Sequence, residues 1–224
     1  IPGGRNVGVA RVNADVILFL DDDAEVLGGD LAAAIVAFDA DPGLGVVALR
    51  LVDETGHTLH RHVPRLGGRS AQRSGPVAQF LGGASLHRRA AFEQVGGYAD
   101  EFFYAMEESD LALRLIDAGY TIRYEPALRV FHPHSSPSRH PGALERTARN
   151  RVWMAHRNLP QPCAAIYVAV WTLLTAVRNA RNREAVRASW RGTRLGLAEP
   201  LGPRRPIRWR TVWRLCCLGR PPVI

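Results

Sequence analysis

The stretch VILFLDDDAE, residues 16–25, decides the fold of this 224-residue chain. Its five apolar residues, 16–20, form the short uninterrupted run that is typical of a strand buried on both faces, as in a parallel sheet. Three carboxylates, those of Asp21, Asp22 and Asp23, follow at the strand end, where open α/β sheets bind their ligands. Adjacent carboxylates repel each other, so a hard cation, Mg²⁺ or Mn²⁺, is expected among them. In an extended segment Asp21 and Asp23 point to the same side and are predicted to act as a pair. The alternative is a solvated acidic turn.

The charged residues are distributed unevenly along the chain. Residues 1–138 hold 12 arginines and 18 acids, a net charge of −6, whereas residues 139–224 hold 17 arginines and 3 acids, a net charge of +14. We therefore predict a catalytic domain over 1–138 and a basic helical extension over 139–224 that faces an anionic partner. No nucleic-acid-binding pattern accompanies the arginines, so an anionic membrane is favoured over nucleic acid. The three cysteines form no disulfide framework, which fits a reducing compartment.

Residues 163–177, CAAIYVAVWTLLTAV, form the most apolar stretch of the basic part. They are fewer than the roughly 20 residues that a membrane span needs. We predict an interfacial or core helix, with the protein held peripherally on the inner face of the plasma membrane. The alternative is a solvated basic tail that packs its tryptophans on the domain.

Acidic residues also begin a predicted helix in the middle of the chain. Glu107, Glu108 and Asp110 precede the helical pattern LALRLIDA, residues 111–118. Acids in a first turn interact favourably with the helix dipole, and a desolvated one can act as a general base. His132 directly follows a predicted strand, as a third metal ligand or as a structural histidine would.

Two other short motifs are candidates for ligand contact. Arg5 and Asn6 could meet a phosphate or a base, or could lie in a surface loop. Gly82 and Gly83 precede a strand-like run, where glycines allow close approach of the backbone to a ligand or form a bulge.

Three stretches of the chain together carry a family resemblance: GGRNVGVARVNADVILFLDDDAE, FLGGASLHRR and GGYADEFFYAMEESDLALRLIDAGYTIRYEPALRVFHPHS. In this order they resemble a family 2 glycosyltransferase with the GT-A fold, of the bacterial envelope type that includes rhamnosyltransferases. The resemblance covers about residues 3–135. It implies an α/β fold with a mainly parallel, Rossmann-like sheet flanked by helices, followed here by the basic α-helical extension. Family members begin with a further βαβ unit, so we expect the chain to be truncated at its N-terminus.

The resemblance also implies roles for individual residues. The metal ligands would be Asp21, Asp23 and His132. The nucleotide and the donor sugar would meet Arg5, Asn6, Asp21, Asp22, Gly82, Gly83 and Ala84. The catalytic base would lie in the motif that begins at Glu107 and Glu108, with Asp110 as its next acid. The family often has Asp at the second position of this motif, where this chain has Glu108.

The predicted function is inverting glycosyl transfer from a nucleotide sugar to a hydroxyl of a cell-envelope or lipid-linked glycan. Glu108 would act as base, and Mg²⁺ or Mn²⁺ would bind the donor diphosphate. One alternative is a metal-dependent nucleotidyltransferase or phosphotransferase, which leaves the motif EESDL unexplained. Another is a non-catalytic module that binds an anionic lipid or nucleic acid through the arginine-rich part.

Overall fold

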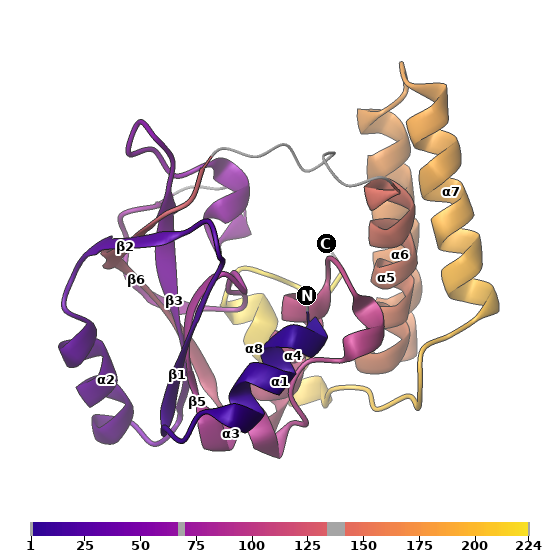
Figure 1. The fold of residues 1–224 in the computed structure, drawn as a ribbon. Helices are drawn as coiled ribbons and strands as arrows, with labels where there is room; N and C mark the ends of the chain where they lie inside the picture. The colour runs from indigo at the N-terminus through magenta and orange to yellow at the C-terminus, as the bar shows by residue number, and fades with distance from the viewer. Residues whose placement is uncertain (1, 67–69, 134–141, 224) are drawn as a thin grey trace.

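The computed structural model describes residues 2–66, 70–133 and 142–223 (Figure 1). The helices are α1 (Pro2–Arg11), α2 (Leu31–Ala40), α3 (Arg89–Gln94), α4 (Glu107–Ala118), α5 (Ala143–Asn158), α6 (Gln161–Arg178), α7 (Arg183–Ala198) and α8 (Trp209–Cys217). The strands are β1 (Val16–Leu20), β2 (Glu25–Gly28), β3 (Leu44–Val52), β4 (Gly75–Val77), β5 (Ala84–Arg88) and β6 (Thr121–Phe131).

The strands form one mixed sheet in the order β1-β5-β3-β6-β2, and β4 pairs with β6. β3 and β6 are parallel, whereas the other described pairings are antiparallel. The α/β fold is as predicted, but the expectation of a mainly parallel sheet is wrong. The segment that connects β3 to β5, residues 53–83, contains no α-helix among its described residues. Parallel neighbouring strands need a crossover connection, which is usually a helix, whereas antiparallel strands such as β3 and β5 do not.

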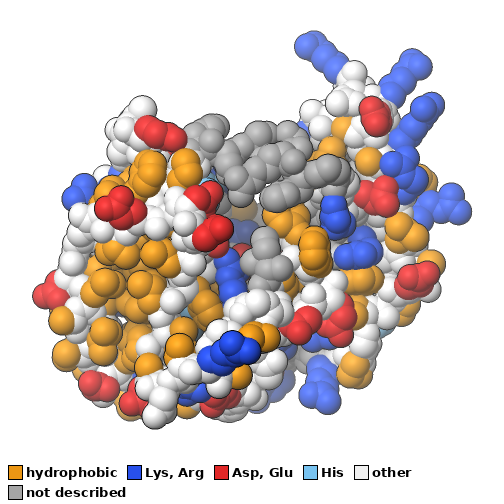
Figure 2. All heavy atoms as spheres, viewed as in Figure 1, with side chains coloured by type: hydrophobic (Ala, Val, Ile, Leu, Met, Phe, Trp, Pro, Cys, Tyr) orange, Lys and Arg blue, Asp and Glu red, His pale blue; other side chains and the backbone are white. Residues whose placement is uncertain are grey.

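Strand β1 is an edge strand of this sheet, and its two faces differ in burial. Ile17 and Phe19 are buried, whereas Val16 and Leu18 are half-buried and Leu20 is 39% exposed. The predicted strand is confirmed, but its burial on both faces is not. Figure 2 shows hydrophobic side chains gathered on the face of the molecule over β1 and α2.

Two hydrophobic clusters cover the two faces of the sheet. On one face α2 packs through Phe38 against side chains such as Val47 of β3. The cluster on the other face joins the sheet to α4 through Leu111, to α5 through Met154 and to α8 through Leu215. The domain boundary predicted at residue 138 lies outside the described residues. The helices beyond it share a core with the sheet, so they are not a separately packed appendage.

Helices α5, α6 and α7 lie side by side at the other end of the molecule (Figure 1). α5 and α7 approach closely because α7 carries glycines at the contact. A Cβ atom at Gly192 would lie 2.0 Å from the carbonyl oxygen of Glu145, and one at Gly196 would lie 2.7 Å from Cβ of Val152. No helix in the described parts of the chain combines the length and the apolarity needed to cross a bilayer. The 163–177 stretch lies in α6, which buries Tyr167 and exposes Leu173.

Candidate active site

The acidic turn after β1 crosses the end of the sheet and meets the end of β6. β2 begins at Glu25, which pairs with Phe131, the last residue of β6. This register brings the preceding aspartates to the residue that follows β6. The Nε2 atom of His132 lies 3.3 Å from Oδ1 of Asp23 and 3.7 Å from Oδ2 of Asp21.

These three side chains form a donor set that fits a divalent cation. One ligand atom from each of Asp21, Asp23 and His132 lies within 4.8 Å of the others. Nδ1 of His132 lies 2.8 Å from the carbonyl oxygen of Pro133, which can only accept a hydrogen bond. Nδ1 can donate a hydrogen bond to this carbonyl, which turns Nε2 toward the aspartates, the orientation that a metal-ligating histidine needs. Two carboxylates and one imidazole suit Mn²⁺, and also Mg²⁺ where further oxygens come from a substrate.

The predicted trio is thus brought together, while metal binding itself stays a prediction. Asp22 is exposed and lies outside the trio. Its predicted contact with the donor also stays a prediction. Asp21 and Asp23 lie together as expected, but Asp22 and Asp23 form a turn and not the extended segment from which the pairing was predicted.

Arg5 of α1 links this donor set to the acidic start of α4. Its Nη2 atom lies 2.9 Å from Oδ1 of Asp21, and its Nη1 atom lies 3.6 Å from Oε1 of Glu108. The guanidinium lies over the ring of Tyr98, with 5.7 Å from Cζ to the ring centroid. Two acidic motifs that are far apart in the sequence therefore share one arginine. The positive charge of Arg5 favours the ionised form of the Glu108 carboxyl group.

The glycine pair before β5 lets these side chains lie directly against the backbone. The amide of Gly82 donates a hydrogen bond to Oε1 of Glu108 at 3.3 Å. A Cβ atom at Gly82 would lie 2.1 Å from Nη1 of Arg5, and one at Gly83 would lie 2.0 Å from Oδ2 of Asp21. Close approach to the backbone is as predicted, and the groups that approach are the site's own side chains. Contact of this segment with a donor sugar stays a prediction.

Two residues assigned to the site by the resemblance are structural. The side chain of Ala84 is wholly buried in the core, so it cannot contact a donor. Asp110 is also wholly buried, and its carboxylate accepts hydrogen bonds from Arg114 at 2.5 Å, Arg157 at 3.0 Å and Asn158 at 2.7 Å. A carboxylate that is so fully paired has no access to an acceptor hydroxyl. Asp110 instead joins α4 to α5.

The first two acids of α4 differ in environment. Glu107 is 3% exposed, and burial together with repulsion from Glu108 raises the pKa of its carboxyl group to about 8. Its Oε2 atom has no hydrogen-bond partner among the described residues. Burial also raises the pKa of Glu108, while Arg5 and the amide of Gly82 lower it. The side chain of Glu108 is 24% exposed. With a pKa of about 8, Glu107 keeps its proton at neutral pH, and Glu108, which is partly exposed and contacts Arg5, is the better candidate base of the pair.

Asn6 holds the loop that lies under Arg5. Its Nδ2 atom donates to the carbonyl oxygen of Tyr98 at 2.8 Å, and its Oδ1 atom accepts from the amide of Tyr98 at 3.0 Å. Both ends of the amide are therefore engaged within the protein. Its predicted role as a nucleotide ligand stays a prediction.

Asn150 of α5 is a positioning residue that sequence reasoning did not identify. Its buried Nδ2 atom lies 2.7–2.9 Å from the carbonyl oxygens of Phe102, Tyr104 and Ala105. This loop enters α4 through residues with positive φ, among them Ala105 (68°) and Met106 (74°), a backbone that side-chain-bearing residues rarely adopt. The carbonyl contacts offset that strain and fix where α4 begins. No local pattern marks this asparagine within the basic helix.

Comparison with known proteins finds glycosyltransferases among the similar proteins. Residues 65–135 match the family model described as the N-terminal domain of galactosyltransferase. The pre-mycofactocin glycosyltransferase of Mycobacterium tuberculosis is 34% identical over 145 residues, which cover 60% of this chain and 30% of that protein. The O-antigen chain rhamnosyltransferase RfbN of Salmonella typhimurium is 28% identical over 145 residues, which cover 59% of this chain and 46% of that protein. The chain is a relative of bacterial glycosyltransferases.

Solved structures show the same fold. GalNAc-T7, crystallised with UDP, GalNAc and Mn²⁺, has a TM-score of 0.51 at 15% identity, over 91% of this chain and 45% of that chain. Residues 1–349 of Staphylococcus aureus TarS, in complex with UDP-GlcNAc, have a TM-score of 0.52 at 13% identity, over 69% of this chain and 46% of that chain. The predicted GT-A fold is thereby confirmed. The chain spans about a third of the length of the first curated relatives that it matches.

Proposed function

We propose that this chain carries out metal-dependent, inverting transfer of a sugar from a nucleotide-sugar donor to a hydroxyl of a cell-envelope or lipid-linked glycan. The observation that carries the proposal is the contact of Arg5 with both Asp21 and Glu108. This contact supports the proposal because it links the candidate metal ligands to the candidate base. A relative named N-acetylglucosaminyl-diphospho-decaprenol L-rhamnosyltransferase, 44% identical over 57 residues, supports a lipid-linked acceptor.

The donor set of Asp21, Asp23 and His132 would hold Mg²⁺ or Mn²⁺, which when bound supplies positive charge that stabilises a departing nucleoside diphosphate. Arg5 would keep Asp21 oriented. Its Nη1 atom is buried without a hydrogen-bond partner among the described residues, so it is available to a substrate oxygen. The other residues of the glycine segment would leave room for the donor sugar.

Glu108 would take the proton from the acceptor hydroxyl as that oxygen attacks the anomeric carbon. A base must come within about 3 Å of the oxygen that it deprotonates. Partial exposure gives Glu108 that access, and the adjacent protonated Glu107 adds no second negative charge. Inversion follows when a single attack of this kind occurs on the face opposite the leaving group.

The test measures products released from a panel of UDP-, dTDP- and GDP-sugars with and without Mn²⁺. The proposal expects metal-dependent release of nucleoside diphosphate by the wild type, and its loss in Asp23→Asn and in Glu108→Gln. Mn²⁺ binding, followed by electron paramagnetic resonance, should weaken in Asp23→Asn and persist in Glu108→Gln. Release of pyrophosphate would instead support nucleotidyl transfer. Unchanged Mn²⁺ binding in Asp23→Asn would refute the metal site.

We further propose that α6 and α7 hold the enzyme peripherally against an anionic membrane at its cytoplasmic face. An apolar groove of about 760 Å³ lies between α5, α6 and α7. Trp190 and Leu197, which line it, are 56% and 63% exposed. Six arginines and one acid lie within 178–194. Figure 2 shows arginine side chains projecting from the end of the molecule that holds these helices. Exposed apolar groups beside cations suit the headgroup region of an anionic bilayer.

Sedimentation with vesicles tests this attachment. Binding to vesicles with anionic lipid should exceed binding to neutral vesicles and should fall with salt. Three exposed arginines are replaced together in the test variant: Arg181→Gln, Arg187→Gln and Arg194→Gln. Three others on the opposite part of the molecule are replaced in the control: Arg11→Gln, Arg123→Gln and Arg129→Gln. At roughly 1 kcal/mol for each arginine near the surface, the test variant should bind about 100-fold more weakly. Equal binding by both variants would contradict the attachment.

A further inference from the structure

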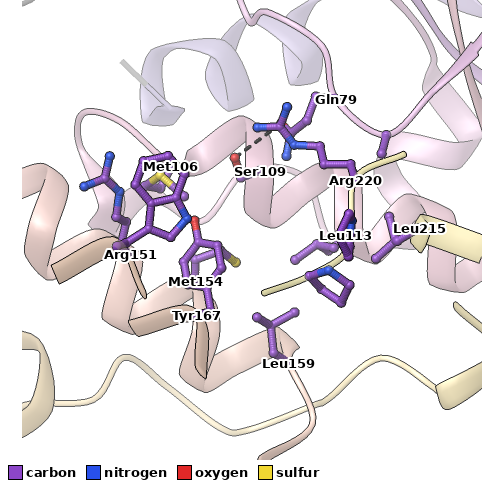
Figure 3. A pocket seen from close by; sticks show the side chains of 14 residues that line it. Gln79, Met106, Ser109, Leu113, Arg151, Met154, Leu159, Tyr167, Leu215 and Arg220 are labelled. Carbon is purple, nitrogen blue, oxygen red and sulfur yellow. Dashed lines mark hydrogen bonds between the residues drawn. The ribbon is translucent and has the colours of Figure 1, made fainter. Parts of the chain in front are cut away.

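A second cavity, of about 200 Å³, lies among α4, α5, α6 and the chain around α8 (Figure 3). Its apolar wall includes Leu113 of α4, Met154 of α5 and Leu215 of α8. Two arginines line the same cavity, Arg151 of α5 and Arg220 of the segment after α8. Figure 3 shows these arginines on opposite sides of the cavity.

Neither arginine has an acidic partner within the described ranges. Arg151 donates to the hydroxyl of Thr175 at 3.2 Å and stacks on the ring of Trp171 at 4.2 Å, but its buried Nε atom has no hydrogen-bond partner there. For the guanidinium of Arg220, no hydrogen bond or ion pair to a described residue is present. Burial lowers the pKa of both guanidinium groups.

Buried cations are normally paired, because removing a charge from water without compensation is strongly unfavourable. The chain follows this rule elsewhere: Arg114 and Arg157 are both paired with the carboxylate of Asp110. Both arginines are half-buried; Arg151 stacks on Trp171, and no such ring contact to Arg220 is present among the described residues. Two guanidinium groups without an acidic partner around one cavity form a site that suits an anion.

One residue that lines the cavity directly follows the candidate base in the sequence. Ser109, which lines it, donates a hydrogen bond to Gln79 at 3.3 Å. Glu108, one residue earlier, accepts a hydrogen bond from Gly82, three residues beyond Gln79. The first turn of α4 therefore carries both Glu108 and a residue that lines the cavity.

We propose that this cavity binds the phosphoryl group of the acceptor, with Arg151 and Arg220 as its ligands and the apolar wall beside the adjoining hydrocarbon. The assignment to the acceptor rests on the proposed function, whereas the anion site does not. Tyr167 supplies a hydroxyl donor to the same anion. The guanidinium groups match phosphoryl oxygens in geometry and remain charged at any physiological pH.

The binding test uses inorganic diphosphate in EDTA at fixed ionic strength, followed by calorimetric titration and thermal unfolding of the full chain. EDTA removes the metal, so the test is independent of the Asp21–Asp23–His132 site. Diphosphate should bind the wild type and raise its unfolding temperature. Arg151→Met and Arg220→Met should each weaken binding about 10-fold or more, the factor expected for a lost charge-assisted hydrogen bond. Arg210→Met, at an exposed position of α8, should bind as the wild type does.

Thermal unfolding without ligand separates a binding role from a structural one. Replacing an unpaired buried cation by an apolar side chain of similar length should leave the unfolding temperature unchanged or raise it. A lowered unfolding temperature in both methionine variants, with diphosphate binding unchanged, would overturn the proposal. So would equal diphosphate binding by the wild type and the double variant, because the anion would then bind elsewhere.

A second arm uses farnesyl diphosphate to identify the source of the phosphoryl group. Tighter binding of farnesyl diphosphate than of inorganic diphosphate, lost in Arg220→Met, supports a lipid-linked acceptor. Equal affinity for the two probes would refute the acceptor assignment. Asp23→Asn is the control for the proposed function: it should abolish turnover and leave metal-free diphosphate binding intact. Turnover by the wild type with no diphosphate binding would overturn the anion site while leaving the transferase proposal in place.

Discussion

Replacing Glu107 with glutamine should remove a pH dependence of stability that this buried carboxyl group imposes. The pKa of Glu107 is raised from 4.5 to about 8 by burial and by Glu108. Between these values the folded state keeps a proton that the unfolded state has lost. The resulting contribution to stability is therefore fully present below pH 4.5 and is lost as the pH rises through 8. At 1.36 kcal/mol for each pKa unit, the loss between pH 5 and pH 8 is about 3 to 4 kcal/mol.

Urea unfolding followed by circular dichroism, at pH 5 and pH 8 and constant ionic strength, measures this loss. Glutamine mimics the protonated carboxyl group, so Glu107→Gln should match the wild type at pH 5 and exceed its free energy of unfolding by about 3 kcal/mol at pH 8. Glu93→Gln, at a glutamate of α3 whose side chain is 55% exposed, reports the effect of removing one surface charge.

A single outcome would refute the reasoning. If Glu107→Gln differs from the wild type by the same amount at both pH values, to within about 1 kcal/mol, the folded protein does not hold the proton on Glu107. The assignment of Glu108 as the ionised partner would then lose its electrostatic support. If the reasoning holds, Glu107→Gln should also keep transferase activity at pH 7, whereas Glu108→Gln should lose it.

Three further substitutions test other parts of the site. Gly83→Ala should weaken Mn²⁺ binding by about 10-fold or more, because its Cβ atom would lie 2.0 Å from Oδ2 of Asp21. The control is Gly8→Ala, in the open space around α1, which should stabilise the fold by about 1 kcal/mol and leave Mn²⁺ binding unchanged. Burial lowers the pKa of His87 to about 3, so its contribution to stability is lost as the pH falls from 6.5 toward 3. The stability of the wild type relative to His87→Leu should accordingly fall by about 3 kcal/mol between pH 7 and pH 4, and a constant difference in urea unfolding would contradict this. Asn150→Ala should lower kcat more than it changes the KM for the donor and should cost about 2 kcal/mol in stability; an unchanged kcat would show that the loop before α4 does not need these hydrogen bonds.

The candidate metal site could be located from the sequence because it depends on local order. A strand followed directly by acids places those acids at the sheet edge, and a histidine that follows another strand running the same way reaches that edge too. Asp21, Asp23 and His132 fulfil this expectation. The sequence did not indicate that β2 pairs with the end of β6, the pairing that brings the two aspartates close to His132.

The direction of the strands and the burial of Asp110 could not be predicted. An apolar pentapeptide such as VILFL has the same pattern in a parallel and in an antiparallel sheet, so the sequence could not show that β5 runs opposite to β1 and β3. Asp110 has the pattern of an exposed first-turn acid. Its burial follows from Arg157 and Asn158, which lie nearly fifty residues later and meet it only through tertiary packing.

The contacts that α5 makes with α4 have a consequence for anyone who exchanges parts between related enzymes. Asn150 holds the backbone that leads to the candidate base, Glu108, and Asn158 holds the carboxylate of Asp110 two residues beyond it. A hybrid that joins this sheet to another enzyme's C-terminal helices would keep every candidate metal ligand and still misplace Glu108. A workable junction therefore lies before residue 98 or after residue 158, so that both helices are inherited from the same parent.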